Sequence, residues 1–229
     1  MSGRMTERIG ESMTEQAGTE LLLIRHGETA WNAVRRLQGH LDIGLNDAGR
    51  RQAAALARAL AAEPLAAIVA SDLQRAMHTA EAVASFHHVP FHTDRELRER
   101  GYGVFEGLLY TEIEERYPDH FAAWQGRHVD SVMPHGERHA ESFRHFYERC
   151  IAAIGRWAGQ YPGRKLAIVA HGGVLECAYR AAREMTLDSP RDFQVRNASI
   201  NRFTFAGGKL ALTQWGEVDH LAQALDDIV

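Results

Sequence analysis

The sequence is poor in cysteine and contains no long hydrophobic run. Its two cysteines, Cys150 and Cys177, are too few for the disulfide framework of a small secreted protein, so we expect reduced, buried thiols in a cytoplasmic protein. No apolar stretch approaches the ~18 residues that a membrane-spanning helix needs, so no membrane segment is predicted. The polar first 19 residues lack the apolar core of a signal peptide, and we interpret residues 1–19 as a flexible tail.

An excess of charge of one sign is also missing. The chain has 26 Lys and Arg against 30 Asp and Glu, which gives a net charge of −4. Such a mildly acidic chain lacks the basic surface that nucleic-acid-binding proteins use, so no nucleic-acid partner is expected. Hydrophobic residues make up 45% and charged residues 24%, a globular composition that excludes a fully disordered chain. Net charge does not exclude a small cationic pocket.

Short apolar runs alternate with longer amphipathic stretches, which predicts one α/β domain over residues 20–229. Three runs have the continuous apolar character of strands covered on both faces: 21–24, 65–70 and 165–170. The runs 200–205 and 210–215 alternate around a pair of glycines and predict a hairpin.

Amphipathic stretches predict four main helices, at 47–62, 72–85, 137–159 and 174–185. Asn46 or Asp47 can cap the first, and Ser71 with Gln74 fits a capping box for the second. The region from 90 to 136 is interrupted by glycine and proline, and only one or two short helices are expected there, between 110 and 124.

Polar residues follow each of the three buried strands. Arg25-His26-Gly27-Glu28 follows the first, Ser71-Asp72 with Arg75 the second, and His171-Gly172-Gly173 the third. Ligands of open α/β sheets bind outside the carboxyl ends of the strands. If the three strands are parallel neighbours, two histidines and two arginines converge on one pocket.

Such a pocket suits a phosphate dianion. The planar fork of arginine donates parallel hydrogen bonds to phosphate, and a helix N-terminus adds free N–H groups. A neutral imidazole nitrogen can attack phosphorus and form a covalent intermediate. Neighbouring positive charge favours that neutral form. The same arginines would stabilise the transition state electrostatically.

These residues resemble the signature of the histidine phosphatase superfamily, which includes cofactor-dependent phosphoglycerate mutase. The likeness spans about residues 20 to 220 and lies in blocks that stand in the family's order: Arg25-His26-Gly27-Glu28-Thr29-Ala30-Trp31-Asn32, Gln38-Gly39, Leu45 to Gly49, Ser71 to Ala76, Leu97 to Gly107, and Ala170-His171-Gly172-Gly173. The resemblance implies a three-layer α/β/α sandwich with a mostly parallel central sheet.

The resemblance also implies a role for each matching residue. His26 would be the nucleophile that becomes phosphohistidine, and Arg25, Arg75 and His171 would hold the phosphoryl group. Glu99 would protonate the leaving oxygen and then activate water; the match selects it over Glu96 in a charge run, with Glu106 as the next candidate. The residues expected to line the substrate or phosphate side are Thr29, Asn32, Gln38, Gly39, Tyr102 and Gly172. Family members need no metal.

Two reactions remain open after the phosphohistidine. The mutase branch uses a lysine and paired arginines after the catalytic glutamate, but residues 107–134 hold no lysine and only Arg116 and Arg127, among several acidic residues. The absence of this anion clamp favours hydrolysis of a phosphomonoester over mutase activity. A mutase would additionally need priming by 2,3-bisphosphoglycerate, whereas a phosphatase needs no cofactor. A non-catalytic phospholigand-binding protein is a remote alternative.

The partner expected in every case is a small phosphorylated metabolite. Its identity depends on the segment Gly107 to Glu141, which is expected to cover the pocket and whose composition does not specify a substrate. The family that the sequence resembles includes monomers, dimers and tetramers, and the sequence does not decide between a monomer and a homodimer.

Overall fold

A six-stranded mixed sheet forms the centre of the molecule. The computed structural model describes residues 18–134 and 136–222. Its strands are β1 (Thr19–Arg25), β2 (Leu65–Ala70), β3 (Phe91–Thr93), β4 (Lys165–Ala170), β5 (Ile200–Ala206) and β6 (Lys209–Glu217). Their order is β3-β2-β4-β1-β5-β6; β1 to β4 run parallel, whereas β5 and β6 are antiparallel to their neighbours.

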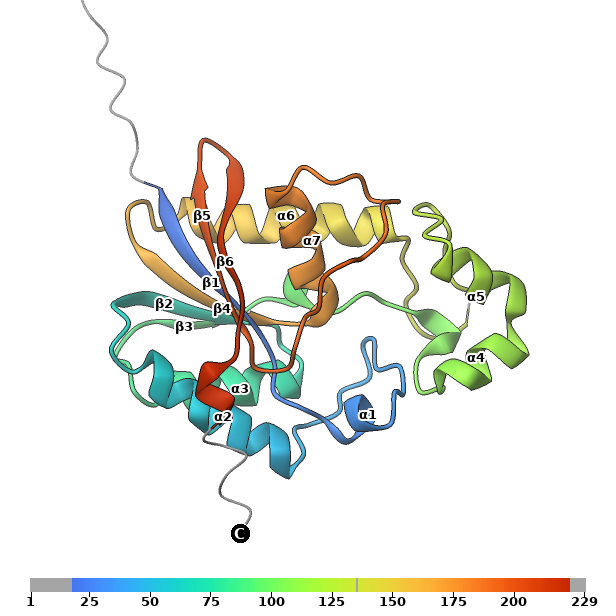
Figure 1. Ribbon diagram of the computed structural model, residues 1–229, viewed down its shortest axis with the longest axis horizontal. Helices are drawn as coiled ribbons and strands as arrows, with labels where there is room; N and C mark the ends of the chain where they lie inside the picture. Colours follow the sequence, from blue (N-terminus) through green and yellow to red (C-terminus); the bar gives the residue numbers. More distant parts are fainter. Residues whose placement is uncertain (1–17, 135, 223–229) are drawn as a thin grey trace, which may run out of the picture.

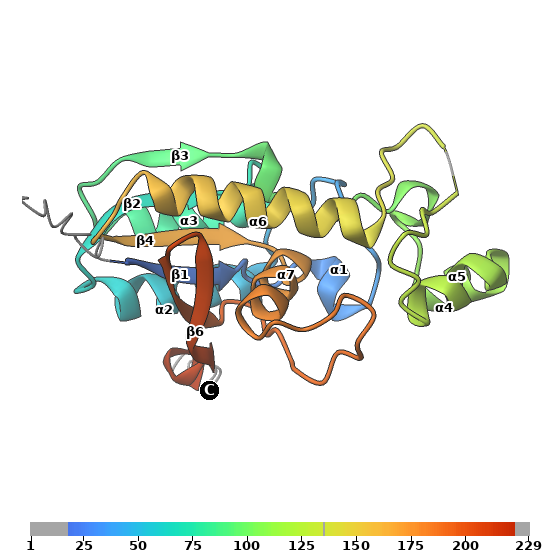
Figure 2. The same cartoon turned by 90° about the horizontal axis from the view of Figure 1, so that it is seen from above.

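Helices cover both faces of this sheet, which makes the three layers that the resemblance implies (Figure 1). Helices α2 (Asp47–Leu60) and α3 (Gln74–Ala84) lie on one face, and α6 (Phe143–Gly159) and α7 (Gly172–Ala182) lie on the other (Figures 1 and 2). The alternation of side chains along β1 explains the arrangement: Leu22 and Ile24 pack against α2, while Leu21 and Leu23 pack with α6 and α7.

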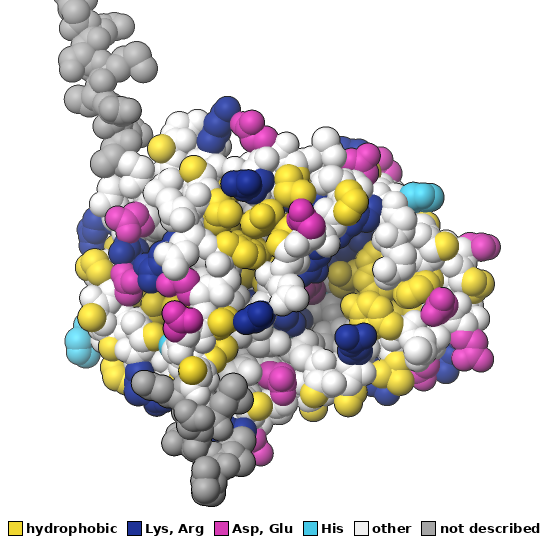
Figure 3. Space-filling view, in the orientation of Figure 1, with side chains coloured by type: hydrophobic (Ala, Val, Ile, Leu, Met, Phe, Trp, Pro, Cys, Tyr) yellow, Lys and Arg dark blue, Asp and Glu magenta, His cyan; other side chains and the backbone are white. Residues whose placement is uncertain are grey.

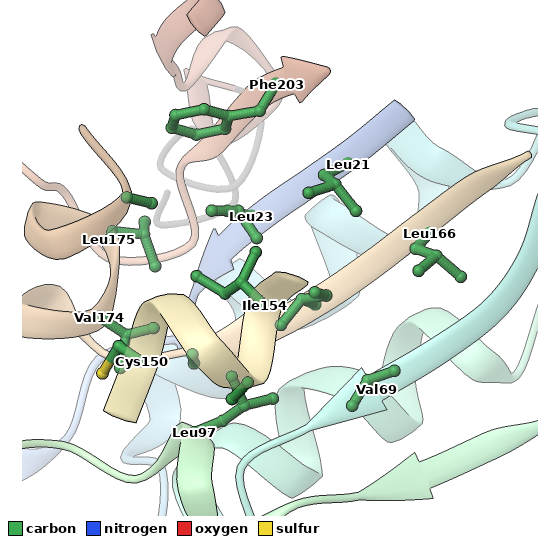
Figure 4. Packing of buried hydrophobic residues seen from close by; sticks show 14 of the residues in the cluster. Leu21, Leu23, Val69, Leu97, Cys150, Ile154, Leu166, Val174, Leu175 and Phe203 are labelled. Atoms are coloured by element: carbon green, nitrogen blue, oxygen red, sulfur yellow. The ribbon is translucent and has the colours of Figure 1, made fainter. Parts of the chain in front are cut away.

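The larger core lies between the sheet and the α6–α7 layer. Figure 4 shows Leu21 and Leu23 of β1 facing Ile154 of α6 and Leu175 of α7. All four side chains are fully buried. Burial on this scale, about 25 cal/mol per Å² of apolar surface, is what holds the strand ends in place.

A smaller helical unit projects from one end of the sheet. It contains α4 (Tyr110–Arg116) and α5 (Pro118–Gln125), and it packs around the buried residues Leu37, Phe105, Ile113 and Met133 (Figures 1 and 2). The remaining short helices are α1 (Ala30–Ala33) and three 3₁₀ turns at Arg95–Leu97, Gly103–Phe105 and Asp219–Leu221. None of the helices in the described ranges is long and apolar enough to span a membrane.

The sequence predicts the strands better than the segment boundaries around them. Both buried strands expected at 65–70 and 165–170 are confirmed, as are the hairpin and the two short helices of the irregular region. The predicted tail wrongly includes Thr19, which begins β1 and whose hydroxyl donates to Ala158 O at 2.8 Å. The rest of the predicted tail, residues 1–17, lies outside the described residues.

Two further expectations are wrong in detail, and one short strand has no counterpart among the predicted elements. The helix expected from 137 begins at Phe143, with Ser142 as its N-cap. The edge strand β3 was not predicted, because three residues are too short to show a period. Ser71 does not cap the second helix: α3 begins at Gln74, whose backbone N–H donates instead to Asp42 at 2.7 Å.

Candidate active site

The carboxyl ends of β1, β4 and β2 lie side by side and bring the predicted groups together. His26 follows β1 and His171 follows β4, the two central parallel strands. Their ring centroids lie 5.2 Å apart, with the ring planes at 60°. Arg75 comes from the first turn of α3, after β2, and its Nε lies 3.3 Å from His171 Nδ1. The convergence predicted from three strand ends is therefore present.

The hydrogen bond of His26 fixes which ring nitrogen is free. His26 Nδ1 lies 2.6 Å from the backbone oxygen of Gly27. A carbonyl oxygen can only accept, so Nδ1 carries the proton and the neutral ring keeps its lone pair on Nε2. The residue is 3% exposed and lines a cavity of about 490 Å³. This arrangement presents an unprotonated nitrogen to a ligand.

The surroundings keep His26 in that neutral form. Burial lowers its pKa well below the ordinary value, and the positive charges of Arg75 and Arg25 lower it further. The pKa of His171 is likewise lowered well below its ordinary value, first by burial and then by Arg75. Both imidazoles therefore stay neutral at physiological pH.

The two arginines face the same cavity from different positions. Arg25 donates from Nη1 to Val195 O at 2.6 Å, but its buried Nε has no hydrogen-bond partner in the described part of the chain. Arg75 holds the neighbouring loop by donating to Leu41 O and Gly39 O at 2.9 and 2.8 Å. Burial lowers the pKa of Arg75 to about 10, so it remains charged at neutral pH.

Ser71 supports His171 instead of a helix terminus. Its Oγ lies 2.8 Å from His171 Nε2, and it can donate or accept. Because Arg75 Nε donates to Nδ1 of the same ring, Nε2 carries the proton here and donates to Ser71.

Glu99 lies at the other side of the cavity and is held by backbone donors. Its Oε2 accepts from Gly173 N at 3.0 Å and its Oε1 accepts from Arg100 N at 2.9 Å. A Cβ at position 173 would lie 2.2 Å from Glu99 Oε1, so only glycine lets the carboxylate approach α7 this closely. Arg98, the residue before Glu99, is held by Asp72, whose two carboxylate oxygens accept from its guanidinium group, both at 2.6 Å.

Most of the other expected residues line the cavity. Asn32, Gln38, Gly39, Tyr102 and Gly172 do so, together with Arg25, Arg75 and Glu99. Two residues do not: Thr29 and His171 are fully buried behind its wall. Thr29 caps α1 and its Oγ1 lies 3.1 Å from Asn32 Oδ1, which leaves the Asn32 amide N–H groups free for a ligand. Thr29 therefore positions Asn32 instead of touching substrate.

Several residues in or next to the cavity were not foreseen. Asn197 Nδ2 donates to His26 O at 3.0 Å, and Arg191 lies in the wall nearby. Both belong to the segment between α7 and β5. One signal could have found them: β5 is antiparallel to β1, so the chain must enter β5 at the edge where β1 ends. The other unforeseen wall residues are Trp31, Arg35, Arg36, Leu37, Tyr110, Gly173 and Glu176.

Known proteins resemble the chain in sequence and in fold. The model of the histidine phosphatase superfamily (branch 1) matches residues 21–218. A phosphoglycerate mutase-like protein 4 of Arabidopsis thaliana is 38% identical over 207 residues, covering 89% of this chain and 87% of its own. A metal-independent phosphoserine phosphatase of the same plant is 33% identical over 210 residues, covering 91% and 85%. The solved structure of Bacillus stearothermophilus YhfR superposes with a TM-score of 0.79 at 34% identity, covering 89% of this chain and 99% of that one.

Proposed function

The chain belongs to the histidine phosphatase superfamily, and on that premise we propose that it hydrolyses phosphomonoesters through a phosphohistidine on His26. The observation that carries the proposal is the hydrogen bond from Nδ1 to Gly27 O, which leaves the Nε2 lone pair beside two guanidinium groups. Relatives whose names give phosphatase activities support the same reaction class.

In the first step, His26 Nε2 attacks phosphorus and the bond from phosphorus to the ester oxygen breaks. Arg25 and Arg75 face the charge on the equatorial oxygens, and Gly172 offers its backbone N–H at the start of α7. The unpartnered Nε of Arg25 would gain a phosphate oxygen. His171 would act through Arg75, whose Nε donates to its Nδ1, and would hold that guanidinium against the phosphoryl group.

Glu99 would act as the general acid in the first step and as the general base in the second. An alkoxide is a poor leaving group, so the carboxylic acid gives its proton to the departing ester oxygen. The resulting carboxylate then takes a proton from water as the water oxygen attacks phosphohistidine. The phosphorus–nitrogen bond breaks, phosphate leaves, and both His26 and Glu99 return to their starting states.

The activity is tested by hydrolysis of p-nitrophenyl phosphate and of a panel of natural phosphomonoesters. We expect turnover well above the uncatalysed rate, without added metal, and at least a roughly thousandfold loss in His26→Ala. Full activity in that variant would show that His26 is not the nucleophile. A wild-type protein that hydrolyses none of the esters would refute the proposed function.

Phosphoglycerate mutase activity is the second candidate, because a relative at 38% identity carries a mutase-like name. The same phosphohistidine would then return its phosphoryl group to an organic acid, after priming by 2,3-bisphosphoglycerate. Rapid interconversion of 2- and 3-phosphoglycerate, with p-nitrophenyl phosphate hydrolysis at background, would decide for the mutase.

We further propose that the enzyme uses no metal and acts on a small phosphorylated metabolite in the cytoplasm. The arginines supply the positive charge that a metal would otherwise bring to phosphate, and a relative is named a metal-independent phosphoserine phosphatase. Cys150 and Cys177 are both free and buried, which suits a reducing compartment.

A further inference from the structure

A buried carboxylate beside the cleft has no part in the catalytic steps proposed above. The catalytic cavity and a second cavity of about 550 Å³ form one continuous cleft. The residues that line both are Tyr102, Tyr110, Gly173, Glu176 and Arg191. On the face shown in Figure 3, Lys and Arg side chains border a hollow between the α4–α5 unit and the rest of the molecule. Glu106 is 3% exposed and lines neither cavity, so it lacks the contact with a leaving oxygen that a general acid needs.

One peptide group connects Glu106 to Arg75. The N–H of His40 donates to Glu106 Oε1 at 3.0 Å. The C=O of the same peptide belongs to Gly39 and accepts from Arg75 Nη2 at 2.8 Å. Both charged side chains are buried, since Arg75 is only 1% exposed. Buried charge is costly unless it is paired, so the two opposite charges compensate each other through this peptide.

The link bears on how Arg75 meets a phosphoryl group. Its guanidinium donates from Nε to His171, from Nη1 to Leu41 O and from Nη2 to Gly39 O. Each terminal nitrogen carries a second N–H, and the pair can donate in parallel to two oxygens of a phosphate. The two backbone acceptors therefore determine the angle at which the guanidinium faces the cavity.

The same oxygen of Glu106 also holds the opposite wall of the cleft. Tyr102 N donates to Oε1 at 3.0 Å, whereas the buried Oε2 has no hydrogen-bond partner in the part of the chain that the structure describes. Burial raises the pKa of Glu106, and the N–H groups of His40 and Tyr102, with the charges of Arg138 and Arg75, oppose that rise. One carboxylate oxygen thus joins two segments that line the cleft.

Gly39 lets the carboxylate come this close. Its φ of +53° lies in the left-handed region that favours glycine, and a Cβ at this position would overlap Glu106 Oε1. The backbone nearby is connected independently, because Leu37 N donates to Leu108 O at 2.9 Å and Gly107 N donates to Leu37 O at 2.8 Å. The side chain of Glu106 extends this connection to the peptide that meets Arg75.

We propose that Glu106 is a positioning residue, which holds the guanidinium of Arg75 against the phosphoryl group through the peptide between Gly39 and His40. The inference rests on the proposed hydrolysis, since it concerns the group that faces the transition state of that reaction. Arg75 touches the substrate, and Glu106 neither contacts the substrate nor transfers a proton. The length of the Glu106 side chain is decisive, because it places the acceptor at His40 N.

Two substitutions separate the length of the side chain from its charge. Glu106→Asp keeps the charge but is shorter by one carbon–carbon bond, about 1.5 Å, which removes the acceptor from hydrogen-bond range of His40 N. Glu106→Gln loses the charge but keeps an oxygen at the same distance. We expect kcat/KM to fall by roughly thirtyfold in Glu106→Asp and by less than about fivefold in Glu106→Gln.

Glu112→Asp is the matched control. Glu112 also accepts a backbone N–H, from Leu109 at 2.7 Å, but it lines neither cavity and forms no bond with the loop that meets Arg75. Its kcat/KM should stay within about twofold of the wild type. Wild-type kcat/KM in Glu106→Asp, or a larger loss in Glu106→Gln than in Glu106→Asp, would overturn the proposal.

Two further measurements distinguish the positioning of Arg75 from a general loss of order. Arg75 faces the phosphoryl oxygens whatever the leaving group is, so Glu106→Asp should lower kcat/KM for an alkyl phosphate and for p-nitrophenyl phosphate by the same factor. In Arg75→Met, adding Glu106→Asp should lower kcat/KM by less than about threefold, because the group that Glu106 positions is gone. A larger loss for the alkyl phosphate, or the full loss in the Arg75→Met background, would contradict the proposal.

Binding of inorganic phosphate separates this inference from the proposed reaction. Calorimetry should give a Kd about tenfold higher in Glu106→Asp than in the wild type and in Glu112→Asp. Gly39→Ala, whose methyl displaces the same carboxylate, should raise the Kd similarly and provides a second variant if Glu106→Asp does not fold. That pattern without hydrolysis by the wild type would reject the proposed function and retain the positioning role. Hydrolysis with unchanged phosphate affinity in the folded variants would do the reverse.

Discussion

At the residue scale, the reactivity of His26 follows from influences on its pKa that act in opposite directions. The carbonyl of Gly27 fixes the proton on Nδ1 and by itself favours a protonated ring. Burial and the arginines outweigh it and hold the pKa well below the ordinary value. The ring is therefore oriented by a bond to an acceptor and kept neutral by its surroundings.

This depressed pKa predicts how stability depends on pH. Below the ordinary histidine pKa of about 6.5, the unfolded chain binds a proton at His26 that the folded protein does not bind, so the free energy of unfolding falls as the pH falls. Between pH 7 and pH 5 the loss amounts to up to about 2 kcal/mol for each such histidine. Denaturant titrations at both pH values measure it.

The variant His26→Asn should reduce that loss by the share of one histidine, whereas His88→Asn, at an exposed position, should leave it unchanged. An identical pH dependence in wild type and His26→Asn would mean that His26 takes up its proton over this pH range in the folded protein as it does in the unfolded chain. The nucleophile assignment would then lose its electrostatic support.

The hydrogen-bond partner of Ser71 differs from the one that the local sequence predicts. Its place before α3 predicts an N-cap, but the hydroxyl is turned towards His171, one hundred residues away in the chain. Capping boxes are recognised from local spacing, and a contact between two adjacent strand ends leaves no local pattern. The same limit hides Asn197 and Arg191, which reach the site from a segment without regular structure.

Replacing Ser71 by alanine should impair the site more than the fold. The variant leaves His171 Nε2–H buried without a partner, which costs about 1–3 kcal/mol of stability and lowers kcat by roughly tenfold. Ser85→Ala is the control, because the exposed Ser85 hydroxyl donates only to Ala82 O within its own helix terminus. Wild-type kcat in Ser71→Ala would show that this bond does not orient the imidazole.

At the scale of elements, the N-terminus of α7 organises the cleft. Gly172 lines the cavity beside His26, Gly173 donates its N–H to Glu99, and Glu176 pairs with Arg127 and Arg191. The strand before it is continuous and apolar, so its end and the first turn of α7 are fixed by the core. Glycine at both first positions removes the side chains that would fill the site.

Gly173→Ala tests the position of Glu99. The added methyl would lie 2.2 Å from Glu99 Oε1 and 2.8 Å from Phe146, so the carboxylate must move and the core must adjust. We expect kcat/KM for an alkyl phosphate to fall by roughly a hundredfold, but much less for p-nitrophenyl phosphate, whose leaving group needs little protonation.

Gly159→Ala, where a methyl meets nothing within 4 Å, should leave both substrates unaffected. Equal losses for the two esters in Gly173→Ala would point to general misfolding of the site and would contradict a general-acid role for Glu99.

At the scale of the whole molecule, the sequence predicts the framework and misses the wall of the cleft. The three buried strands and their polar ends are visible because a strand covered on both faces must be apolar throughout, so that a charge at its end stands out. The charge of the cleft wall depends on which side chains point into the cleft, and composition does not give that direction. Exposed Glu114 and Glu115 and buried Arg100 look alike in composition, although only the arginine faces the cleft.

The contrast between a net charge of −4 and an arginine-lined cleft predicts a salt effect. Counter-ions screen the attraction of the cleft for an anionic ester, so kcat/KM should fall by roughly threefold or more between 0.02 and 0.5 M NaCl. Thermal unfolding in the same buffers serves as the control for stability. A constant kcat/KM across this range would mean that the cleft does not attract its substrate electrostatically.

Rapid quenching shows whether phosphorus becomes bonded to the imidazole of residue 26 during turnover. Protein mixed with a ³²P-labelled phosphomonoester and denatured in alkali should retain label that alkali preserves and acid removes, on the peptide containing His26. His26→Ala should retain none. Turnover by the wild type with no protein-bound label at any quench time, or equal labelling of the alanine variant, would contradict the account.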